Sequence, residues 1–217
     1  MELDKDLFWK NKKVLITGHT GFKGSWLATW LNLLGSNICG ISLMPENDLN
    51  LFEQINLNER IKYNHFVDLR EIKNLSSIIE EFKPDIVFHL AAQSLVIESF
   101  EDPIKTWSTN VMGTANLLSS LSNNKNNCVV IIVTTDKVYK NKEWIYGYRE
   151  IDRLGGNDPY SASKAATELL VDSWRKSFCK KEQKYRLKIA SVRAGNVIGG
   201  GDWAKDRLIP DSIKSLS

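Results

Sequence analysis

The chain has 217 residues, of which 42% are hydrophobic and 25% charged, and its formal net charge is +3. This composition is that of an ordinary globular protein, and the length allows one substantial core. The net charge is too small and too dispersed to indicate a nucleic-acid partner. No stretch approaches the roughly 18 uninterrupted apolar residues of a membrane-spanning helix, and the N-terminal residues contain no signal-peptide core. We therefore expect a cytoplasmic protein that binds neither nucleic acid nor membrane.

The three cysteines are Cys39, Cys128 and Cys179. They are odd in number and widely spaced, and two of them lie in apolar, strand-like runs. This pattern is typical of buried free thiols in a reducing compartment. Neither a disulfide framework nor a metal site is expected.

The first structural signal is a short apolar strand followed by a glycine-rich turn. Residues 14–16 are Val-Leu-Ile, and Gly18, Gly21 and Gly24 follow with G-x-x-G-x-x-G spacing before a helical pattern begins. Glycines at these positions let the backbone turn tightly and approach a pyrophosphate, and the helix N-terminus offers unpaired N–H groups to it. The segment therefore predicts a dinucleotide-binding strand, turn and helix.

Apolar residues after the turn recur at helical spacing between Trp26 and Leu34, and Gly35 stands where this helix should end. We expect its aromatic stripe, Trp26 and Trp30, to pack on the sheet. Further strand patterns lie at 38–43, 65–67, 85–92, 128–134 and 187–194, and helical patterns at 51–55, 71–82, 106–121, 160–178 and from 208 onward.

Strand and helix alternate along the chain, which predicts an α/β fold with a doubly wound parallel sheet of the Rossmann type. The expected strand order is 3-2-1-4-5-6. Residues 128–134 form a nearly continuous apolar run, which indicates a central strand covered on both faces. Ligands of such sheets bind beyond the carboxyl ends of the strands.

A second chemical signal is the pair Tyr160 and Lys164, which form a Y-x-x-x-K pattern at the start of a predicted helix. The spacing places both side chains on one helix face. A free tyrosine titrates near ~10, and a neighbouring ammonium favours the phenolate, so we expect Tyr160 to act as a base near neutral pH.

The glycine turn, Thr135 at the end of the central strand, Tyr160 and Lys164 occur in an order that resembles the extended short-chain dehydrogenase/reductase superfamily. Its extended branch modifies sugar nucleotides with a nicotinamide cofactor. The resemblance implies that Thr135 hydrogen-bonds the substrate oxygen that is oxidised.

Asp136 and Lys137 follow Thr135 directly, where sugar-nucleotide epimerases usually carry small or apolar residues. This charged pair resembles the CDP-glucose 4,6-dehydratases, as do the stretches 17–27, 134–139, 147–164 and 193–211. The resemblance implies an NAD-dependent lyase in a polysaccharide pathway, which oxidises C4, eliminates water across C5 and C6 and returns the hydride to C6. Asp136 and Lys137 would be the general acid and base of the elimination.

The same resemblance implies roles for further residues. Asp68 and Leu69 would meet the adenine, Asn110 would support the active site, and Arg207 would suit a pyrophosphate. The implied cofactor residues are Gly18, His19, Gly21, Phe22, Lys23, Gly24, Asp68, Leu69, Leu90, Ala91, Ala92, Gln93, Asn110, Tyr160 and Lys164, and the implied substrate residues are Asn196, Gly201, Asp202, Trp203 and Arg207.

Two departures from the resemblance leave alternatives open. An NAD site usually has an acidic residue at the end of its second strand, but Ser42 and Leu43 stand there. His19 and Lys23 could face a ribose 2′-phosphate, so NADP is an alternative to NAD.

The second departure is at the C-terminus, where the sugar-binding domain of such enzymes is expected to be largely missing. We expect residues 1–194 to form the dinucleotide-binding domain with the catalytic residues, and 195–217 to begin the sugar-nucleotide region. A 4-epimerase or reductase of another sugar nucleotide, and a non-catalytic dinucleotide-binding remnant, are the rival hypotheses. Apolar residues on the helices near 106–121 and 160–178 favour a homodimer.

Overall fold

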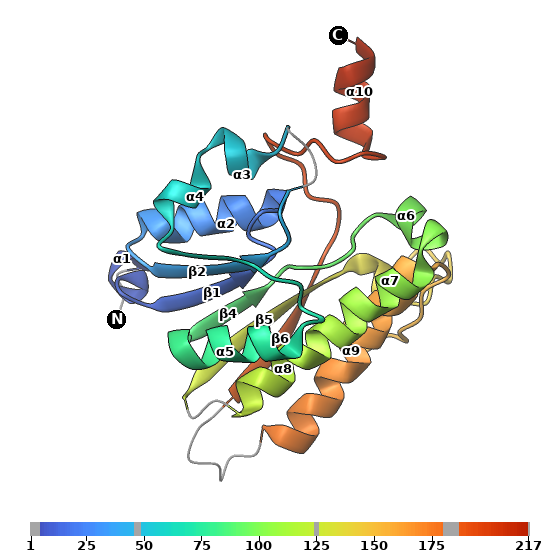
Figure 1. Cartoon of the computed structure of the whole chain (residues 1–217). Helices are drawn as coiled ribbons and strands as arrows, with labels where there is room; N and C mark the ends of the chain where they lie inside the picture. Colours follow the sequence, from blue (N-terminus) through green and yellow to red (C-terminus); the bar gives the residue numbers. More distant parts are fainter. Residues whose placement is uncertain (1–4, 46–48, 124–125, 180–186, 217) are drawn as a thin grey trace.

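The computed structural model describes residues 5–45, 49–123, 126–179 and 187–216. Its centre is a single sheet of six parallel strands in the order β3-β2-β1-β4-β5-β6, which confirms the predicted topology (Figure 1). The strands are β1 (Lys13–Thr17), β2 (Asn37–Ser42), β3 (Tyr63–Phe66), β4 (Ile86–His89), β5 (Cys128–Thr135) and β6 (Leu187–Ala194).

Helices cover both faces of this sheet (Figure 1). The first face carries α1 (Lys5–Trp9), α2 (Phe22–Leu33), α3 (Leu51–Gln54) and α4 (Leu57–Arg60), and the second carries α5 (Ile72–Phe82), α8 (Gly113–Asn123) and α9 (Pro159–Phe178). Near the carboxyl edge lie α6 (Val96–Glu101), α7 (Pro103–Trp107), the π-helical turn Ser108–Met112, the 3₁₀ turn Asp136–Val138 and α10 (Leu208–Leu216), which stands apart from both layers.

The apolar runs of the strands form two cores, because successive side chains of a strand point to opposite faces. In β1, Val14 and Ile16 pack in the core under α2, whereas Leu15 packs in the core under α5 and α8. All three side chains are fully buried. Burial on both faces explains the continuous apolar run of β1. The expectation that 128–134 is a central strand covered on both faces is wrong, because β5 is the fifth of the six strands and Val129 on one of its faces is 40% exposed.

Helix α2 packs on the sheet with the face opposite to the one that we expected. Trp26 and Trp30 remain 52% and 64% exposed, whereas small residues such as Gly24 and Ala28 are buried. A Cβ atom on Gly24 would lie only 2.0 Å from the carbonyl oxygen of Gly18. The helix therefore approaches the glycine turn so closely that only small side chains fit between them.

The helix expected over 106–121 is interrupted. The segment begins earlier, as α7, passes through the π-helical turn Ser108–Met112 and continues as α8. Strand β4 also ends at His89 instead of continuing to residue 92. The residues that follow it line a cavity. Both irregularities lie next to the candidate site, where such distortions are common.

The three cysteines are free thiols, as expected, and Cys39 and Cys128 are buried. Burial raises the pKa of each of these two thiols to about 12. Across the part of the chain that the structure describes, no helix combines the length and the apolar character needed to cross a membrane.

Candidate active site

A cavity of about 790 Å³ opens at the carboxyl edge of the sheet, within the size range of small-molecule sites. It is bounded by the glycine turn, by the ends of β4 and β5, by α9 and by the segment after β6. The predicted residues that line it are Gly18, Gly21, Phe22, Lys23, Gly24, Asp68, Leu69, Leu90, Ala91, Ala92, Gln93, Thr135, Lys137, Tyr160, Lys164, Asn196, Gly201, Asp202, Trp203 and Arg207.

The glycine turn leaves one side of its backbone open to this cavity. Gly18 has φ +77°, and a Cβ atom there would meet the backbone N of Ala91 at 2.7 Å. At Gly21, by contrast, a Cβ atom would meet only the carbonyl oxygen of Gly18, at 3.3 Å. Gly18 and Gly24 therefore close the turn against its neighbours, whereas Gly21 leaves free space beside the N-terminus of α2, which is suited to an anion.

His19 lies in the same turn, but its ring points away from the cavity. The side chain is fully buried between Phe52 and Phe66, and its Nε2 lies 2.5 Å from Oδ1 of Asn64. Burial lowers the pKa of this histidine despite that hydrogen bond. The expectation that the His19 ring faces a ribose phosphate is therefore wrong, since the ring is part of the core.

The end of β2 carries a hydroxyl pair in place of an acidic residue. The Oγ1 of Thr20 lies 2.7 Å from the Oγ of Ser42 and donates to the carbonyl oxygen of Leu43 at 3.0 Å. Thr20, Ser42 and Leu43 all line the cavity. Sequence reasoning weighed Ser42 but missed Thr20, because the contact depends on how the glycine turn folds over the strand.

The N-terminus of α9 is fixed by a capping box. The side chain of Asp158 accepts from the backbone N of Ser161 at 2.9 Å, and the Oγ of Ser161 accepts from the backbone N of Asp158 at 3.2 Å. Pro159 occupies the first turn, where its missing N–H has no cost. This cap fixes the first turn of α9, where Tyr160 stands.

Lys164 is buried beneath the cavity and donates from Nζ to the carbonyl oxygen of Val133 at 3.2 Å. Burial lowers its pKa to about 8, with a smaller contribution from the positive charge of Lys23, and the carboxylate of Glu168 opposes the shift. Lys164 is therefore a cation that can release its proton near neutral pH.

The hydroxyl of Tyr160 is hydrogen-bonded to the Thr135 side chain. Its pKa is raised rather than lowered, because burial outweighs both this hydrogen bond and the positive charge of Arg207. The expectation that the Lys164 ammonium lowers the pKa of Tyr160 is therefore wrong for this chain. Thr135 and Tyr160, which the sequence predicts to take part in an oxidation, are nevertheless in contact, and Lys164 is one helical turn away.

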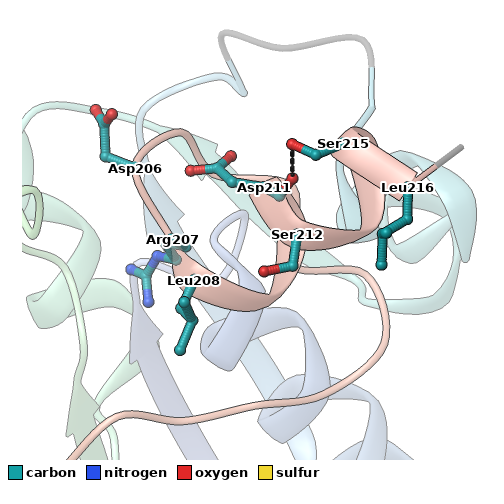
Figure 2. A pocket seen from close by; sticks show the side chains of 7 residues that line it. All are labelled: Asp206, Arg207, Leu208, Asp211, Ser212, Ser215 and Leu216. Atoms are coloured by element: carbon teal, nitrogen blue, oxygen red, sulfur yellow. Dashed lines mark hydrogen bonds between the residues drawn. The ribbon is translucent and has the colours of Figure 1, made fainter.

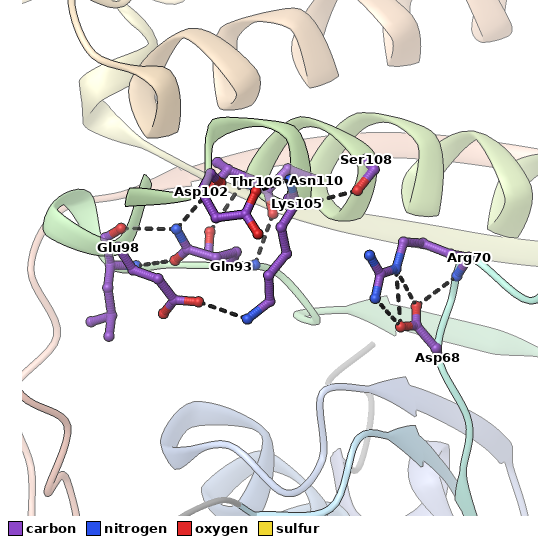
Figure 3. A network of polar contacts seen from close by, with 10 residues as sticks. Asp68, Arg70, Gln93, Glu98, Asp102, Lys105, Thr106, Ser108 and Asn110 are labelled. Carbon is purple, nitrogen blue, oxygen red and sulfur yellow. Dashed lines mark hydrogen bonds and ion pairs between the residues drawn. The ribbon is translucent and has the colours of Figure 1, made fainter. Parts of the chain in front are cut away.

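Asn110 lies at the centre of the π-helical turn and is buried. Its Nδ2 donates to the carbonyl oxygen of Gln93 at 3.0 Å and to the Oγ of Ser163 at 2.9 Å, while its Oδ1 accepts from the backbone N of Gln93 at 2.9 Å (Figure 3). Asn110 does not line the cavity. It joins the cavity wall at Gln93 to α9.

Asp136 and Lys137 lie at the rim, and their side chains are 56% and 44% exposed. The carboxylate of Asp136 is 3.5 Å from the Lys137 ammonium and accepts from the Thr135 hydroxyl at 3.1 Å. Lys137 also donates to Oδ1 of Asn196 at 3.3 Å. Lys137 lines the cavity, whereas Asp136 is beside it.

The segment after β6 crosses over α2. The Nε1 of Trp26 donates to the carbonyl oxygen of Gly200 at 2.9 Å, and a Cβ atom on Gly201 (φ +83°) would meet Leu51 at 2.6 Å. Glycines are therefore needed to bring this segment so close to the first helices. Trp26, which was expected in the core, instead holds a wall of the cavity.

Arg207 stands at the start of α10, between the main cavity and a second hollow whose lining also includes Asp211 and Leu216 (Figure 2). Its guanidinium is 3.7 Å from the carboxylate of Asp202. Among the described residues, Arg207 Nε and Trp203 Nε1 are buried donors without a protein acceptor. Both residues line the cavity, so acceptor oxygens of a bound molecule would satisfy these donors.

Two ion pairs at the cavity wall were not anticipated. Arg70 binds the carboxylate of Asp68 at 2.6 Å, and Lys105 binds that of Glu98 at 2.9 Å (Figure 3). The first pair lowers the pKa of Asp68. The second pair joins α6 to α7. The sequence analysis missed the boundary between these helices, which Asp102, the N-cap of α7 directly before Pro103, could have indicated.

Residues 15–189 match the family described as GDP-mannose 4,6 dehydratase. The chain belongs to this family. A CDP-glucose 4,6-dehydratase of Salmonella typhimurium is 50% identical over 99% of the chain and 60% of its own length. A dTDP-D-glucose 4,6-dehydratase of Dictyostelium discoideum is 34% identical over 97% of the chain and 49% of its own length.

Among solved structures, a UDP-glucose 4-epimerase of Thermus thermophilus in complex with NAD has a TM-score of 0.74 and 28% identity, and 89% of the chain covers 58% of it. A UDP-N-acetylglucosamine 4-epimerase of Methanobrevibacter ruminantium has a TM-score of 0.79 and 26% identity, with coverage of 95% and 63%. The chain therefore spans less than two thirds of the length of these relatives.

Proposed function

We propose that this chain carries the cofactor-binding and catalytic part of a nucleotide-sugar 4,6-dehydratase whose substrate is CDP-glucose. The observation that supports this most directly is the charged pair Asp136 and Lys137 at the rim of a cavity that also holds Thr135, Tyr160 and Lys164. The 50% identity to the Salmonella typhimurium enzyme supports the choice of substrate. In this proposal, residues 195–217 begin the region that binds the sugar nucleotide.

The cofactor in this proposal is NAD. The open backbone at Gly21 and the N-terminus of α2 fit a pyrophosphate, and Thr20 with Ser42 offers neutral hydroxyls at the end of β2. The argument for NADP loses support, because the His19 ring is buried and Lys23 lies close enough to Arg207 and Asp202 to be affected by their charges. NAD, when bound, supplies the site that accepts the C4 hydride and later returns it.

The residues of the chain would divide the proton transfers between them. Thr135 hydrogen-bonds the C4 hydroxyl, and Tyr160 removes its proton, while the Lys164 ammonium adds a positive charge one helical turn away. Asp136 and Lys137 then act at C6 and C5, where one protonates the departing hydroxyl and the other removes the C5 proton. Return of the hydride to C6 and of a proton to C5 then gives a 4-keto-6-deoxy sugar nucleotide, with water as the second product.

The other half of the site would hold the diphosphate of the substrate. Arg207 and Trp203 have buried donors without protein acceptors, and Lys23 lies close enough to Arg207 for the two positive charges to disfavour each other. A diphosphate would supply acceptor oxygens and negative charge together. Asn196, Gly201 and Asp202 complete this wall.

The proposal is tested with two proteins: residues 1–217 alone, and a chimera of 1–217 with the remaining part of the Salmonella relative. We expect 1–217 to bind NAD, measured by calorimetry, with little or no turnover of CDP-glucose, and the chimera to form the 4-keto-6-deoxy product. Tyr160→Phe in the chimera is the control for turnover. A chimera that binds NAD and CDP-glucose but forms no deoxy product would contradict the proposal.

The second candidate is a 4-epimerase, because several similar solved structures are nucleotide-sugar 4-epimerases. The two hypotheses differ in the product, since an epimerase returns the hydride to C4 and retains the C6 hydroxyl. Mass spectrometry distinguishes the two hypotheses, because the dehydratase product is lighter than the epimerase product by one water. Binding of NAD without any turnover by the chimera would instead support the non-catalytic alternative.

We also propose a homodimer formed through α7, the π-helical turn Ser108–Met112 and α9. Ile104, Trp107 and Met112 are 77%, 40% and 56% exposed, and Leu169 of α9 is 62% exposed. Large exposed apolar side chains on neighbouring helices favour protein contacts. Sedimentation velocity of the wild type and of Leu169→Lys would test this, with a monomeric wild type as the contradicting result.

A further inference from the structure

Helix α9 carries a third polar residue on the face of Tyr160 and Lys164. Glu168 follows Lys164 by four residues, so the three side chains lie on successive turns of one face. Its side chain is only 3% exposed. A buried carboxylate is costly unless it is paired and hydrogen-bonded. The partners of Glu168 therefore indicate its role.

The partners of Glu168 come from the ends of two strands. Its carboxylate accepts from Thr134 Oγ1 at 2.5 Å, from Ser191 Oγ at 2.9 Å and from Arg193 Nη2 at 3.0 Å. These hydrogen bonds outweigh the effect of burial, so the pKa of Glu168 lies below its ordinary value. Thr134 directly precedes Thr135, and one carboxylate thus ties β5 and β6 to α9.

Arg193 continues the network away from α9. Its Nη1 donates to the Tyr139 hydroxyl at 2.9 Å and to the carbonyl oxygen of Glu150 at 3.1 Å, and its guanidinium lies 4.9 Å from the centre of the Tyr139 ring. The Tyr139 ring in turn stacks on Tyr148 at 5.0 Å. Arg193 therefore fixes the segment that follows Asp136 and Lys137.

We propose that Glu168 and Arg193 are positioning residues, which hold Thr135 and the Asp136–Val138 turn against the face of α9 and keep Lys164 in its cationic form. This inference rests on the proposed roles of Thr135 and Lys164. Neither residue lines the cavity, so each acts through the groups that it holds.

The charges around Lys164 make the second part of this proposal measurable. Lys23 of α2 disfavours the ammonium, and Glu168 favours it. His89 of β4 also faces Lys164, but it is buried with its pKa lowered to about 3 and is neutral at working pH. Glu168 is therefore the negative charge that opposes both burial and Lys23.

The test is an NMR titration of residues 1–217 labelled with [¹³Cε]lysine, with the Lys164 signal assigned by its loss in Lys164→Met. Glu168→Gln retains the size and the acceptor oxygen but loses the charge, so the titration midpoint of Lys164 should fall by about half a pH unit or more. Asp172→Asn is the matched control, because Asp172 lies one turn further along α9 in an exposed ion pair with Lys176. It should leave the midpoint unchanged.

The direction in which the Lys164 midpoint moves distinguishes the loss of the Glu168 charge from a general loosening of the fold. If Glu168 served only to hold the fold together, its loss would admit water and move the Lys164 midpoint upward, towards the ordinary value. An upward or absent shift in folded Glu168→Gln would overturn the proposal. The titration does not use turnover, so its failure is distinguishable from failure of the proposed dehydratase.

Should Glu168→Gln fail to fold, Tyr139→Phe decides the matter, because it removes only the Arg193–Tyr139 hydrogen bond. Proteolysis between residues 140 and 153 should then become several-fold faster, with the Lys164 midpoint unchanged. Tyr63→Phe, at an exposed tyrosine on β3, is the control. Equal cleavage rates in the wild type and Tyr139→Phe would overturn the proposal.

Discussion

The two groups of candidate catalytic residues are held in different ways. Thr135 and Lys164 are buried, and Lys164 donates to the backbone carbonyl oxygen of Val133. Asp136 and Lys137 follow Thr135 directly in sequence, but about half of each side chain is exposed and their ion pair is 3.5 Å long. Ion pairs of this kind contribute little and are easily rearranged.

This difference separates the two halves of the proposed reaction. Thr135 stands at the end of β5, and Tyr160 and Lys164 stand on α9, so regular secondary structure positions the oxidation group. The elimination pair lies on a short turn at the rim, and its final geometry depends on what covers it. The Thr135–Asp136 hydrogen bond links the two groups, so we expect variants of Asp136 and Lys137 to act mainly, and not exclusively, on the elimination.

The largest effect on folding and on NAD binding is expected at the glycine turn, residues 18–24. Gly24→Val should prevent folding, because the added Cβ would lie 2.0 Å from the Gly18 carbonyl oxygen. Gly21→Val meets no comparable obstacle and should fold, but its side chain would occupy the space proposed for the pyrophosphate. Thermal denaturation and NAD calorimetry would show this, and unchanged NAD affinity in Gly21→Val would contradict the assignment of the turn.

The next largest effect is on the rate of elimination, and it distinguishes the roles of the two groups. In the chimera, Asp136→Asn combined with Lys137→Met should slow elimination by about 10²–10⁴-fold, the usual contribution of general acid–base catalysis. Reduced nicotinamide should still appear, and a 4-keto-glucose nucleotide should accumulate. Tyr160→Phe should abolish the reduced-cofactor signal itself. Formation of deoxy product at the wild-type rate by the double variant would mean that the pair has no catalytic role.

A smaller effect concerns the pH dependence of stability. The pKa of Lys164 in the folded chain is about 8, below its unfolded value, so the unfolded state binds more protons between these values. The cost of burying the ammonium, roughly 3 kcal/mol, is present below pH ~8 and is lost as the pH rises towards ~10.4. The free energy of unfolding of the wild type, relative to Lys164→Met, should therefore increase over this range in urea titrations.

The smallest effect is expected where the segment after β6 crosses α2. Trp26→Phe removes the hydrogen bond to Gly200 but keeps an aromatic ring, and a net loss of about 1 kcal/mol is typical for one such bond. This should weaken CDP-glucose binding to the chimera about fivefold and leave NAD affinity unchanged. Trp30→Phe, at an exposed tryptophan on the same helix, is the control. Equal effects of both substitutions would show that Trp26 does not hold this wall.

Much of the fold was predictable because it depends on local patterns. The apolar runs and their alternation with helices predicted the strand order, which the structure confirms. The spacing of Gly18, Gly21 and Gly24 predicted a turn that the structure builds at the end of β1, and the Tyr160 and Lys164 spacing predicted a shared helix face. The turn and the shared helix face are each set by residues a few positions apart.

The remaining features depend on contacts between distant segments, which no local pattern records. Periodicity marked α2 as a helix, but the contact of Gly24 with Gly18 decided that its small face is buried and Trp26 exposed. The burial of His19 follows from Phe52 and Phe66 of other elements. Similarly, sequence alone made Tyr160, Lys164 and Thr135 candidates, whereas only the tertiary structure joined Glu168 to Arg193, because their hydrogen bond closes across 25 residues of chain.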